Sequence, residues 1–475
     1  MQNGILLATI NAKWIHPSLA LRLLKANLGS LEERCEIMEF ALRQPLCEKT
    51  VPIIAAKPRV LGLSVSIWNL TATAEMLKEL CKTWGTDRPF VVLGGPEVSY
   101  LPKSTEIFEY ADCCVLGEGE TAFRELCQSV FEGKQAKPGK SFFPANPKFR
   151  PEEPGLLKSA YNLYTDEDLC KKLVYVEASR GCPYSCGFCL SANDNKIREF
   201  PLEPFLEEMD SLIRRGARVF KFLDRSFNAN IPRAKRIMEF FIEKLESSKQ
   251  PFTVHFEMVP SRFPDELMQT LAHFPHGSLR LEIGIQTLNP EVAALIGRTS
   301  NPKLEMDTLH LIRQKTNAIV HADLIAGLPG ETLVSFANGF DALWQALSFT
   351  DSSNDKINSL AEIQLGILKL LPGAPIAKHS AAFGMCYNPL PPYEITQSNA
   401  LPACDLDRIK NFARFWELIV NRGLADIGRS PVFDRFMALS DALLARFGRN
   451  WGIPKADLLE AVREYYGDSK VTCLY

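Results

Sequence analysis

Short apolar runs alternate with amphipathic stretches over the first 131 residues of the chain. Between the runs, stretches such as LALRLLKANL and TAEMLKELCKTW repeat their apolar residues at helical spacing. Five runs fit buried strands, at residues 4–10, 35–40, 59–65, 90–95 and 111–117. This alternation predicts an α/β domain with a doubly wound, Rossmann-like parallel sheet, whose ligands bind at the carboxyl ends of the strands.

The alternation stops between residues 132 and 172, where Pro, Gly and Lys are frequent. These residues favour turns and loops over regular elements. We therefore expect a first domain over residues 1–135, followed by a linker over 136–172.

A second alternation follows the linker. Six runs fit strands, at residues 173–179, 218–224, 252–258, 279–285, 318–327 and 362–370. One intervening helix is expected to begin at Asn230, because Pro232 suits the first helical turn. Right-handed crossovers between such units predict a partial (β/α)6 barrel over residues 173–385.

No further strand is expected after about residue 386. The stretches DLDRIKNFARFWELIVNRG, PVFDRFMALSDALLARFG and KADLLEAVREYYG have the apolar spacing of amphipathic helices. The sequence therefore predicts a helical C-terminal domain over residues 386–475.

Composition narrows the class of partner. The chain has 475 residues, of which 46% are hydrophobic and 23% charged, and its net charge is -2. This net charge gives no positive field that would attract nucleic acid or anionic lipid. The sequence also contains no run of 18 apolar residues, which is about the length needed to span a membrane. The first apolar run has no basic leader before it, so we expect no signal peptide and a cytoplasmic protein.

Three of the 13 cysteines stand close together. Cys182, Cys186 and Cys189 follow the first barrel strand in ASRGCPYSCGFCLSA, so neighbouring sulfurs lie within roughly 14 and 11 Å of each other along the chain. Three thiolates without a nearby fourth fit an iron–sulfur cluster with one open iron. A structural zinc site is the alternative, but Cys170 and His255, its nearest further candidates, do not fit the two-plus-two spacing.

The spacing C-x3-C-x2-C, with Phe188 directly before the last cysteine, resembles the signature of radical S-adenosylmethionine (SAM) enzymes. The resemblance implies a 4Fe-4S cluster whose open iron binds the amino and carboxyl groups of SAM, with Phe188 close to it. An electron from a low-potential donor such as flavodoxin or ferredoxin would then cleave SAM to methionine and a 5'-deoxyadenosyl radical. That radical removes a hydrogen atom from the substrate.

Two further segments, EIGIQTLNPEVAALIGR and HADLIAGLPGET, resemble the branch that includes oxygen-independent coproporphyrinogen dehydrogenase and cobalamin-binding enzymes. The resemblance implies that Gln286 and Asp323 hold the ribose hydroxyls of SAM and that Arg298 holds its carboxylate. The turn from Gly327 to Gly330 would run along the adenine, and Glu257 occupies a matching acidic position. Taken singly, Arg298 also fits a solvent-facing helix end, and the glycines fit a plain turn.

One segment departs from the pattern of these relatives. Many of them carry a Gly-Gly-Glu segment after the second barrel strand, where this chain has FLDRSFN. Asp224 and Asn228 are the candidate replacements as acceptors for the amino group of SAM.

The first domain resembles the cobalamin-binding domain of one large radical SAM subgroup. Ser64 and Ser66 follow its third strand, Gly94 and Gly95 its fourth, and Glu118 in LGEGE its fifth. The resemblance implies that these residues line the cleft for the nucleotide tail of cobalamin. The glycine pair also fits a tight turn.

The general cobalamin motif D-x-H-x-x-G is absent, and the first loop reads NAKWIHPSLA. His16 is a candidate axial ligand, but it has no Asp to orient its second ring nitrogen. A histidine packed in the loop is the other interpretation.

The predicted activity is that of a cobalamin-dependent radical methyltransferase acting on an unactivated carbon of a small-molecule or peptide substrate. A cobalamin-assisted rearrangement or oxidation begins with the same radical. A tRNA methylthiotransferase-like enzyme would need a second cluster, for which Cys35, Cys47 and Cys81 are candidates. A non-enzymatic cobalamin or metal sensor is the remaining alternative.

Overall fold

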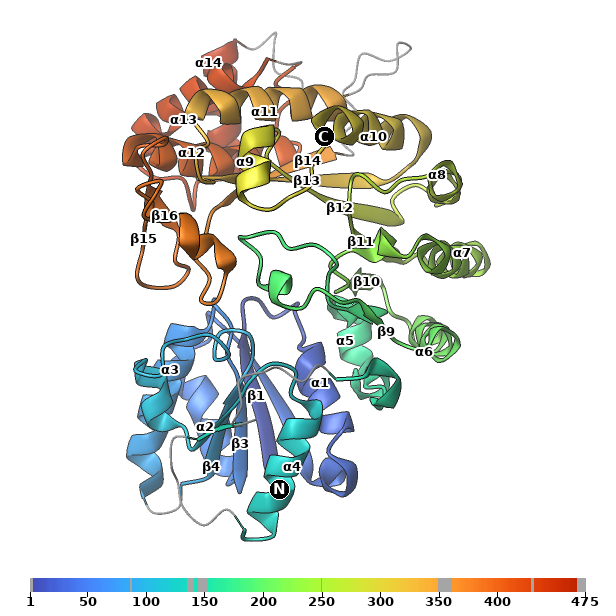
Figure 1. The fold of residues 1–475 in the computed structure, drawn as a ribbon, viewed down its shortest axis with the longest axis vertical. Coiled ribbons are helices and arrows are strands. Elements are labelled where there is room, and N and C mark those ends of the chain that lie inside the picture. The colour runs from blue at the N-terminus through green and yellow to red at the C-terminus, as the bar shows by residue number, and fades with distance from the viewer. Residues whose placement is uncertain are drawn as a thin grey trace. The chain divides into compact units, whose positions relative to one another are not determined.

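The structure, a computed structural model, describes residues 3–85, 88–134, 141–143, 152–248, 250–348, 361–428 and 431–467. The chain folds as two units (Figure 1). Unit 1 comprises Met1–Arg180 and Arg198–Leu223, and unit 2 comprises Gly181–Ile197 and Asp224–Tyr475.

Unit 1 contains the predicted doubly wound sheet. Its parallel strands lie in the order β2-β1-β3-β4-β5-β6. Their bounds are β1 (Ile5–Asn11), β2 (Cys35–Ala41), β3 (Val60–Ser64), β4 (Phe90–Gly94), β5 (Cys113–Val115) and β6 (Ser141–Phe143). The five predicted strands are present, and β6 is an additional strand within the expected linker.

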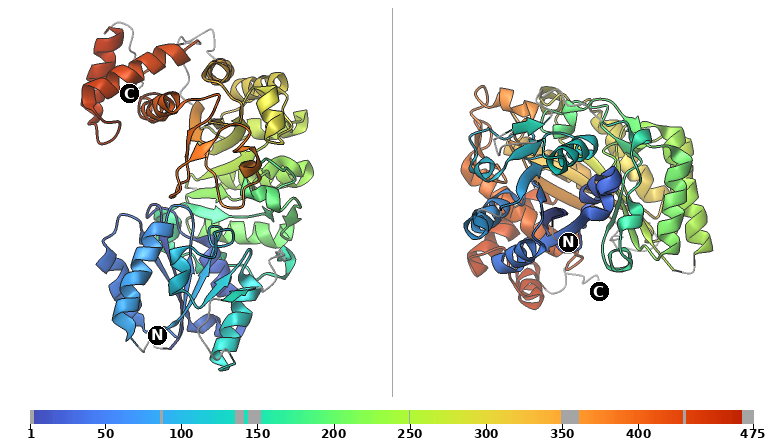
Figure 2. Two further views of the ribbon diagram at one scale, coloured as in Figure 1. Left: turned by 60° about the vertical axis from the view of Figure 1, so that its left-hand side comes forward. Right: turned by 90° about the horizontal axis from the view of Figure 1, so that it is seen from below.

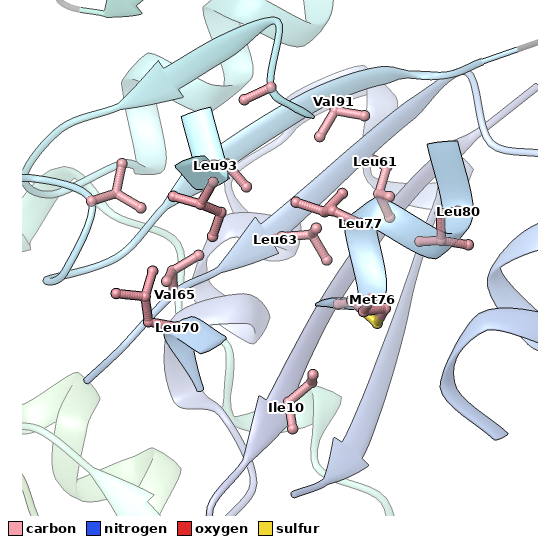
Figure 3. Packing of buried hydrophobic residues seen from close by; sticks show 14 of the residues in the cluster. Ile10, Leu61, Leu63, Val65, Leu70, Met76, Leu77, Leu80, Val91 and Leu93 are labelled. Atoms are coloured by element: carbon pink, nitrogen blue, oxygen red, sulfur yellow. The ribbon is translucent and has the colours of Figure 1, made fainter. Parts of the chain in front are cut away.

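Helices cover both faces of this sheet because side chains along β1 alternate between two cores. Leu6, Ala8 and Ile10 pack with Met76 and Leu77 in one core (Figure 3). Ile5 and Leu7 face the other core, which includes Phe123. The covering helices are α1 (Leu19–Ala26), α2 (Leu46–Ala56), α3 (Leu70–Trp84) and α4 (Glu120–Phe131), and Figure 2 shows them from two further directions.

The strand order places a topological switch point beside β1. β1 pairs with β2 on one side and with β3 on the other, so the chain leaves β1 and β3 in opposite directions. In open parallel sheets, ligands bind at the carboxyl ends of the strands at such a point. The loops after β1, β3 and β4 therefore form the expected binding edge.

The rest of unit 1 leads toward the cysteine segment. β7 (Val174–Val176) pairs in parallel with β10 (Val219–Phe222). β8 (Ser179–Arg180) and β9 (Arg198–Glu199) form a short antiparallel ribbon. Two helices, α5 (Asp166–Lys171) and α6 (Leu202–Arg214), complete this part, and a capping box at Thr165 begins α5.

Unit 2 contains four parallel strands in the order β14-β13-β12-β11. They are β11 (Thr253–Met258), β12 (Leu279–Gln286), β13 (Ile319–Ala326) and β14 (Ala361–Ile367). Their helices are α7 (Ile231–Ser247), α8 (Asp265–Ala272), α9 (Pro290–Leu295), α10 (Pro302–Lys315) and α11 (Leu333–Leu347). With β7 and β10, all six predicted barrel strands are present, and Asn230 caps α7 as predicted.

The C-terminal part of unit 2 is mainly helical, as predicted. It contains α12 (Ala403–Trp416), α13 (Phe433–Phe447) and α14 (Lys455–Tyr466), and a π-helical turn over Glu417–Asn421 extends α12. The expectation of no strands after residue 386 was wrong, because β15 (Cys386–Tyr387) and β16 (Ile395–Gln397) form a small antiparallel pair. These strands are too short for an apolar pattern to reveal them. No helix in the described ranges is long and apolar enough to cross a membrane.

Candidate functional site

The three cysteines of the predicted cluster line one pocket in unit 2. The pocket also takes residues from the carboxyl ends of β11, β12 and β13 and from the region before α10. Predicted residues in its lining are Cys182, Cys186, Cys189, Phe188, Glu257, Gln286, Arg298 and Asp323. Residues that the sequence analysis did not select include Tyr184, Arg225, Ser226, Glu282 and Glu305.

Backbone contacts hold the cysteine segment in place. The Cys182 amide donates to the Asp194 carbonyl at 3.1 Å. Gly187 donates to the Ile296 carbonyl at 2.7 Å and accepts from the Ile376 amide at 2.8 Å. The first bond closes the segment on itself and the other two tie it to two further parts of unit 2, so its path depends on the protein's own backbone as well as on any bound group.

The thiols fit a cluster better than a single ion. None of the three is in a disulfide. Burial raises the pKa of Cys186, although the adjacent Arg298 opposes the shift. Within the described ranges, no three His, Cys, Asp or Glu side chains form a group that could hold one metal ion. In a 4Fe-4S cube each cysteine binds a different iron, so the sulfurs need not converge on one point.

Arg298 and Glu305 place opposite charges in the pocket lining. Arg298 donates from Nη2 to the Gly284 carbonyl, while its buried Nε has no hydrogen-bond partner in the described structure. Glu305 is 1% exposed and accepts from the Ser300 hydroxyl at 3.1 Å through Oε2. Its Oε1 is buried, and no described residue donates to it. A buried polar atom without a partner is costly, so this pair suits a ligand with both carboxylate and ammonium groups.

Gln286 has an unusual backbone. Its φ is +71°, and the pairing of β12 with β13 shifts between Gly284 and Gln286. A Cβ on Gly284 would lie 2.4 Å from Gln286 Nε2, so the glutamine side chain occupies the space that glycine leaves. Bulges and positive φ at non-glycine residues concentrate at functional sites, where they aim a side chain.

Asp224 and Asn228 are predicted SAM residues that do not line the pocket. Asp224 is 2% exposed, and its neighbour Arg225 lines the pocket instead, with Nη1 3.5 Å from Glu257 Oε2. The Glu257 carboxylate holds the pKa of Arg225 above its usual range. Asn228 is also engaged elsewhere, because it donates to the Val259 and Arg262 carbonyls at 2.9 and 2.8 Å. The geometry therefore gives no support to Asp224 and Asn228 as SAM acceptors.

Of the unselected residues Glu282, Arg225 and Glu305, only Glu282 could have been found from a sequence pattern. Glu282 is four residues before Gln286 on the same strand, so the period of two puts both on one face. Arg225 follows the end of β10, where no periodicity applies. Glu305 lies in the first turn of α10, where a carboxylate usually faces the helix N-terminus and solvent.

Among the predicted cobalamin residues of unit 1, Ser64 and Gly94 end β3 and β4, while Ser66 and Gly95 follow these strands. Gly95 has a φ of +104°, and a Cβ there would lie 2.5 Å from the Val65 carbonyl oxygen. The backbone of Val65 leaves no room for a side chain at this position, which explains why the residue is glycine. This agrees with the tight-turn interpretation. Ser66 is buried, and its amide donates to Asn69 Oδ1 at 2.7 Å. Asn69 in turn donates to the Ile10 carbonyl at 2.9 Å, so the loops after β1 and β3 are held together.

The same edge exposes large apolar side chains. Trp14, Ile15 and Trp68 are 48%, 39% and 50% exposed. The Trp68 indole donates to the Ile10 carbonyl at 3.2 Å, so its ring is fixed although half of it is exposed. Rigid apolar surface at the switch point suits a flat macrocycle such as a corrin.

His16 is engaged within unit 1. Its Nδ1 lies 2.7 Å from the Tyr175 hydroxyl, and the two ring centroids are 6.1 Å apart. Burial lowers the pKa of this histidine. These contacts fit the packed histidine. A histidine that ligates through Nε2 also has a partner on Nδ1, so the His16→Ala variant described below decides the axial-ligand interpretation.

The second-cluster alternative finds little support. Cys35 lies in β2 and is 1% exposed, and burial raises the pKa of its thiol to about 12. Cluster ligands are thiolates. Cys35 packs inside the core between the sheet and its helices, which is a poor position for a ligand of a second cluster.

A buried carboxyl next to the pocket predicts a pH-dependent stability. Glu331 is 2% exposed and accepts from Thr287 and Ser335, both at 3.0 Å, and burial raises its pKa to about 7. Because the folded state binds this proton more tightly, the stability it contributes is full below about pH 4 and is lost as the pH rises through 7. We expect Glu331→Gln to gain about 2 kcal/mol relative to wild type between pH 5 and pH 8.

Urea unfolding of both proteins, followed by the fluorescence of the buried Trp344 and Trp416, measures this difference. The exposed Glu167→Gln variant is the control and should show no such trend. A pH-independent difference between Glu331→Gln and wild type would contradict the prediction.

Comparisons with known proteins agree with this arrangement. The family model for the radical SAM superfamily matches residues 176–341, and the model for the B12 binding domain matches residues 5–127. The first match includes the cysteine segment and the strands around the pocket. The second covers the sheet with the exposed edge.

One curated relative carries both cofactors in its name. The cobalamin-dependent radical SAM methyltransferase TokK of Streptomyces tokunonensis is 27% identical over 346 residues, which are 67% of this chain and 48% of TokK. This chain thus spans about half the length of that relative.

Two solved structures share the fold. TsrM from Kitasatospora setae, a radical SAM methyltransferase solved with cobalamin and a [4Fe-4S] cluster, has a TM-score of 0.62 and 20% identity over 85% of this chain and 82% of its own. The cobalamin-dependent radical enzyme OxsB, with aqua-cobalamin bound, has a TM-score of 0.64 and 14% identity over 98% of this chain and 79% of its own.

Proposed function

Since this chain is a radical SAM protein with a B12-binding domain ahead of its radical SAM domain, we propose that it is a cobalamin-dependent methyltransferase acting on an unactivated carbon. The observation that carries the proposal is that three free thiols line one pocket together with Gln286, Arg298 and Asp323, the polar residues expected to bind SAM. The substrate class is a small molecule or a peptide.

The fold family implies a 4Fe-4S cluster, SAM and cobalamin. When bound, they supply a carbon radical that removes a hydrogen atom from the substrate and a methyl group that replaces it. In the proposal, Cys182, Cys186 and Cys189 would hold the cluster, and the backbone bonds of their segment fix the path of the chain that carries them.

Five polar side chains of the pocket have a proposed part in binding SAM. The Arg298 guanidinium is planar and receives the carboxylate, while the open oxygen of Glu305 receives a hydrogen of the amino group. Gln286 and Asp323 accept hydrogen bonds from the ribose hydroxyls. The carboxylate of Glu257 contributes a further acidic group to the SAM site. Phe188 packs beside the cluster, next to Cys189.

Replacing Arg298 tests this assignment. Arg298→Lys keeps the charge but loses the planar fork, so we expect the dissociation constant of SAM to rise about tenfold or more in the reconstituted protein. Glu305→Gln should weaken SAM binding in the same direction. Equilibrium dialysis with labelled SAM measures both variants, and the exposed Glu291→Gln on α9 is the matched control. Unchanged affinity in Arg298→Lys would remove Arg298 from the binding site.

For cobalamin, we propose the carboxyl edge of the unit 1 sheet, with Ser64, Ser66, Gly94 and Gly95 near the nucleotide tail. Trp68 and Trp14 offer apolar surface to the corrin. Because His16 is engaged with Tyr175, we expect His16→Ala to retain hydroxocobalamin as wild type does after desalting. The absorbance of the retained corrinoid measures this, and a large loss in His16→Ala would restore the axial-ligand interpretation.

The test of the function is anaerobic reconstitution with iron, sulfide and hydroxocobalamin, followed by incubation with SAM and a strong reductant. We expect retained corrinoid, 5'-deoxyadenosine and S-adenosylhomocysteine. One methylation uses two SAM molecules, because one supplies the radical and the other the methyl group. A protein that holds a cluster and leaves SAM intact would overturn the proposal.

The same experiment addresses the runner-up. A cobalamin-assisted rearrangement or oxidation would release 5'-deoxyadenosine without S-adenosylhomocysteine. We further propose that a flavodoxin or ferredoxin supplies the electron and that the protein works in the cytoplasm, since reduced thiols and a low-potential donor require a reducing compartment.

A further inference from the structure

Two arginines stand opposite each other at the ends of the cysteine-bearing segment. Arg180 in β8 pairs with Arg198 in β9, and the three cysteines lie between these two residues in the chain. Their side chains are only 11% and 10% exposed. Two buried cations at opposed positions of a ribbon repel each other unless anions compensate them.

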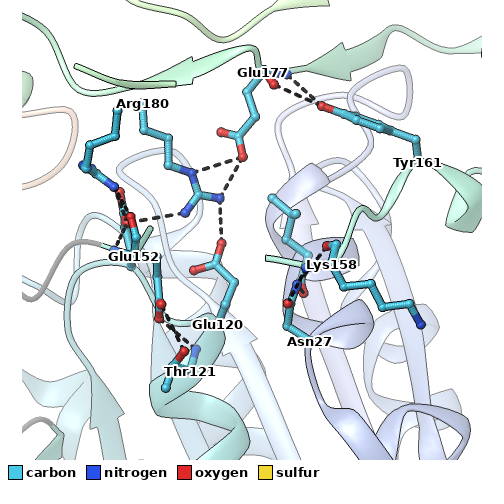
Figure 4. Close-up of polar contacts among 11 residues, drawn as sticks. Asn27, Glu120, Thr121, Glu152, Lys158, Tyr161, Glu177 and Arg180 are labelled. Atoms are coloured by element: carbon cyan, nitrogen blue, oxygen red, sulfur yellow. Dashed lines mark hydrogen bonds and ion pairs between the residues drawn. The ribbon is translucent and has the colours of Figure 1, made fainter. Parts of the chain in front are cut away.

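The compensating anions come largely from LGEGE. Glu118 accepts from Arg198 through both oxygens, at 2.8 and 3.0 Å, and its Oε2 lies 3.4 Å from Arg180 Nη1. Glu120 accepts from Arg180 Nη2 at 2.7 Å, as does Glu177 (Figure 4). Although burial opposes its charge, Arg198 and Arg180 hold the pKa of Glu118 below its usual range.

A fourth donor completes the surroundings of Glu118. The Glu152 amide donates to Glu118 Oε2 at 2.6 Å, and the Glu152 carbonyl accepts from Arg198 at 2.6 Å. A carboxylate offers about four lone-pair positions. Arg198 occupies two of these positions and the Glu152 amide a third, while Arg180 Nη1 lies 3.4 Å from Oε2 as an ion-pair partner, so the Glu118 carboxylate is committed to groups of unit 1.

We propose that Glu118 and Glu120 are positioning residues that hold both ends of the cysteine-bearing segment, and that Glu118 does not contact cobalamin. The proposal goes beyond the proposed function and rests on it only in treating this segment as the support of the cluster. Without these carboxylates, Arg180 and Arg198 face each other with too little opposite charge. The β8–β9 ribbon then opens, so the two ends of the cysteine-bearing segment are no longer held together.

Hydrogen–deuterium exchange of the cofactor-free full chain tests the proposal without relying on activity. The reporter is the Phe200 amide, which donates to the Ala178 carbonyl at 3.0 Å across the ribbon. In Glu118→Gln we expect exchange in the peptide over residues 178–200 to become about tenfold faster. Glu120→Gln should act in the same direction, and it provides a second variant if the first folds poorly.

The matched control is Asp168→Asn, because Asp168 also accepts from a buried arginine of unit 1, Arg22, at 2.9 Å. We expect this variant to leave exchange over residues 178–200 unchanged, and Glu118→Gln to retain hydroxocobalamin as wild type does. Equal acceleration in Asp168→Asn, or none in either LGEGE variant, would overturn the proposal. So would loss of hydroxocobalamin in Glu118→Gln with normal exchange.

Failure of the proposed function has a different signature. It would appear as a wild-type protein that retains no cluster, or that holds a cluster and leaves SAM intact, whatever the exchange result.

Discussion

Cys186→Ala is expected to abolish cluster assembly and SAM cleavage while leaving the cobalamin domain intact. Two thiolates cannot hold a cube that needs three, so iron should fall from about four per chain to below about one. Formation of 5'-deoxyadenosine should then drop by more than about 100-fold, since even outer-shell changes at metal sites cost 10- to 100-fold. Iron analysis and product quantification after anaerobic reconstitution measure both effects.

Cys170→Ala is the matched control for this prediction. Cys170 is an exposed, free cysteine in α5 and belongs to no site described above. Its replacement should leave iron content and SAM cleavage at the wild-type level. Hydroxocobalamin retention in Cys186→Ala shows whether unit 1 is still folded. A Cys186→Ala protein with a full complement of iron would show that the cluster lies elsewhere.

The architecture was accessible from the sequence because it follows from periodicity. Buried parallel strands require continuous apolar runs, and these placed five strands of the first sheet and six of the barrel. Turn residues were less informative. The run rich in Pro and Gly was interpreted as a linker, yet it contains β6, whose three residues are too few to show a pattern.

Site residues could be predicted where their spacing or a family resemblance identified them. They could not be predicted where the tertiary fold determines which side chain faces the pocket. Cys182, Cys186 and Cys189 could be placed because a three-cysteine loop can serve one centre. Asp224 and Arg225 show the limit, since one step along a turn moves a side chain from the core to the pocket. No sequence pattern shows which of these two neighbouring side chains faces the pocket.

LGEGE illustrates a different limit. Its position after a strand of the cobalamin-type sheet suggested a cleft residue, whereas the Glu118 carboxylate meets Arg198 from a segment 80 residues later. Partners so far apart in the chain are brought together only by the tertiary fold. The open hydrogen-bond positions of Arg298 and Glu305 are likewise properties of the folded packing, and the sequence alone does not contain them.

Gly181→Ala should disrupt the cysteine segment almost as severely as losing a ligand. Gly181 has a φ of +85°, and a Cβ there would lie 1.9 Å from the Lys196 carbonyl oxygen. A positive φ alone costs about 1–2 kcal/mol at a residue with a side chain. The clash adds more, because the neighbour is backbone and the Cys182 amide beside it bonds to Asp194. We expect cluster retention after desalting, measured by iron content, to fall about tenfold or more.

Gly277→Ala separates the two contributions to this effect. Gly277 has a φ of +76°, and a Cβ there would meet nothing within 4 Å, so its substitution carries the backbone strain without the clash. It should lower the stability of unit 2 modestly and leave cluster retention unchanged. If Gly277→Ala lost iron to the same extent as Gly181→Ala, general loosening of unit 2 would explain both. If Gly181→Ala kept its iron, the close approach of Lys196 would have no part in shaping the cluster segment.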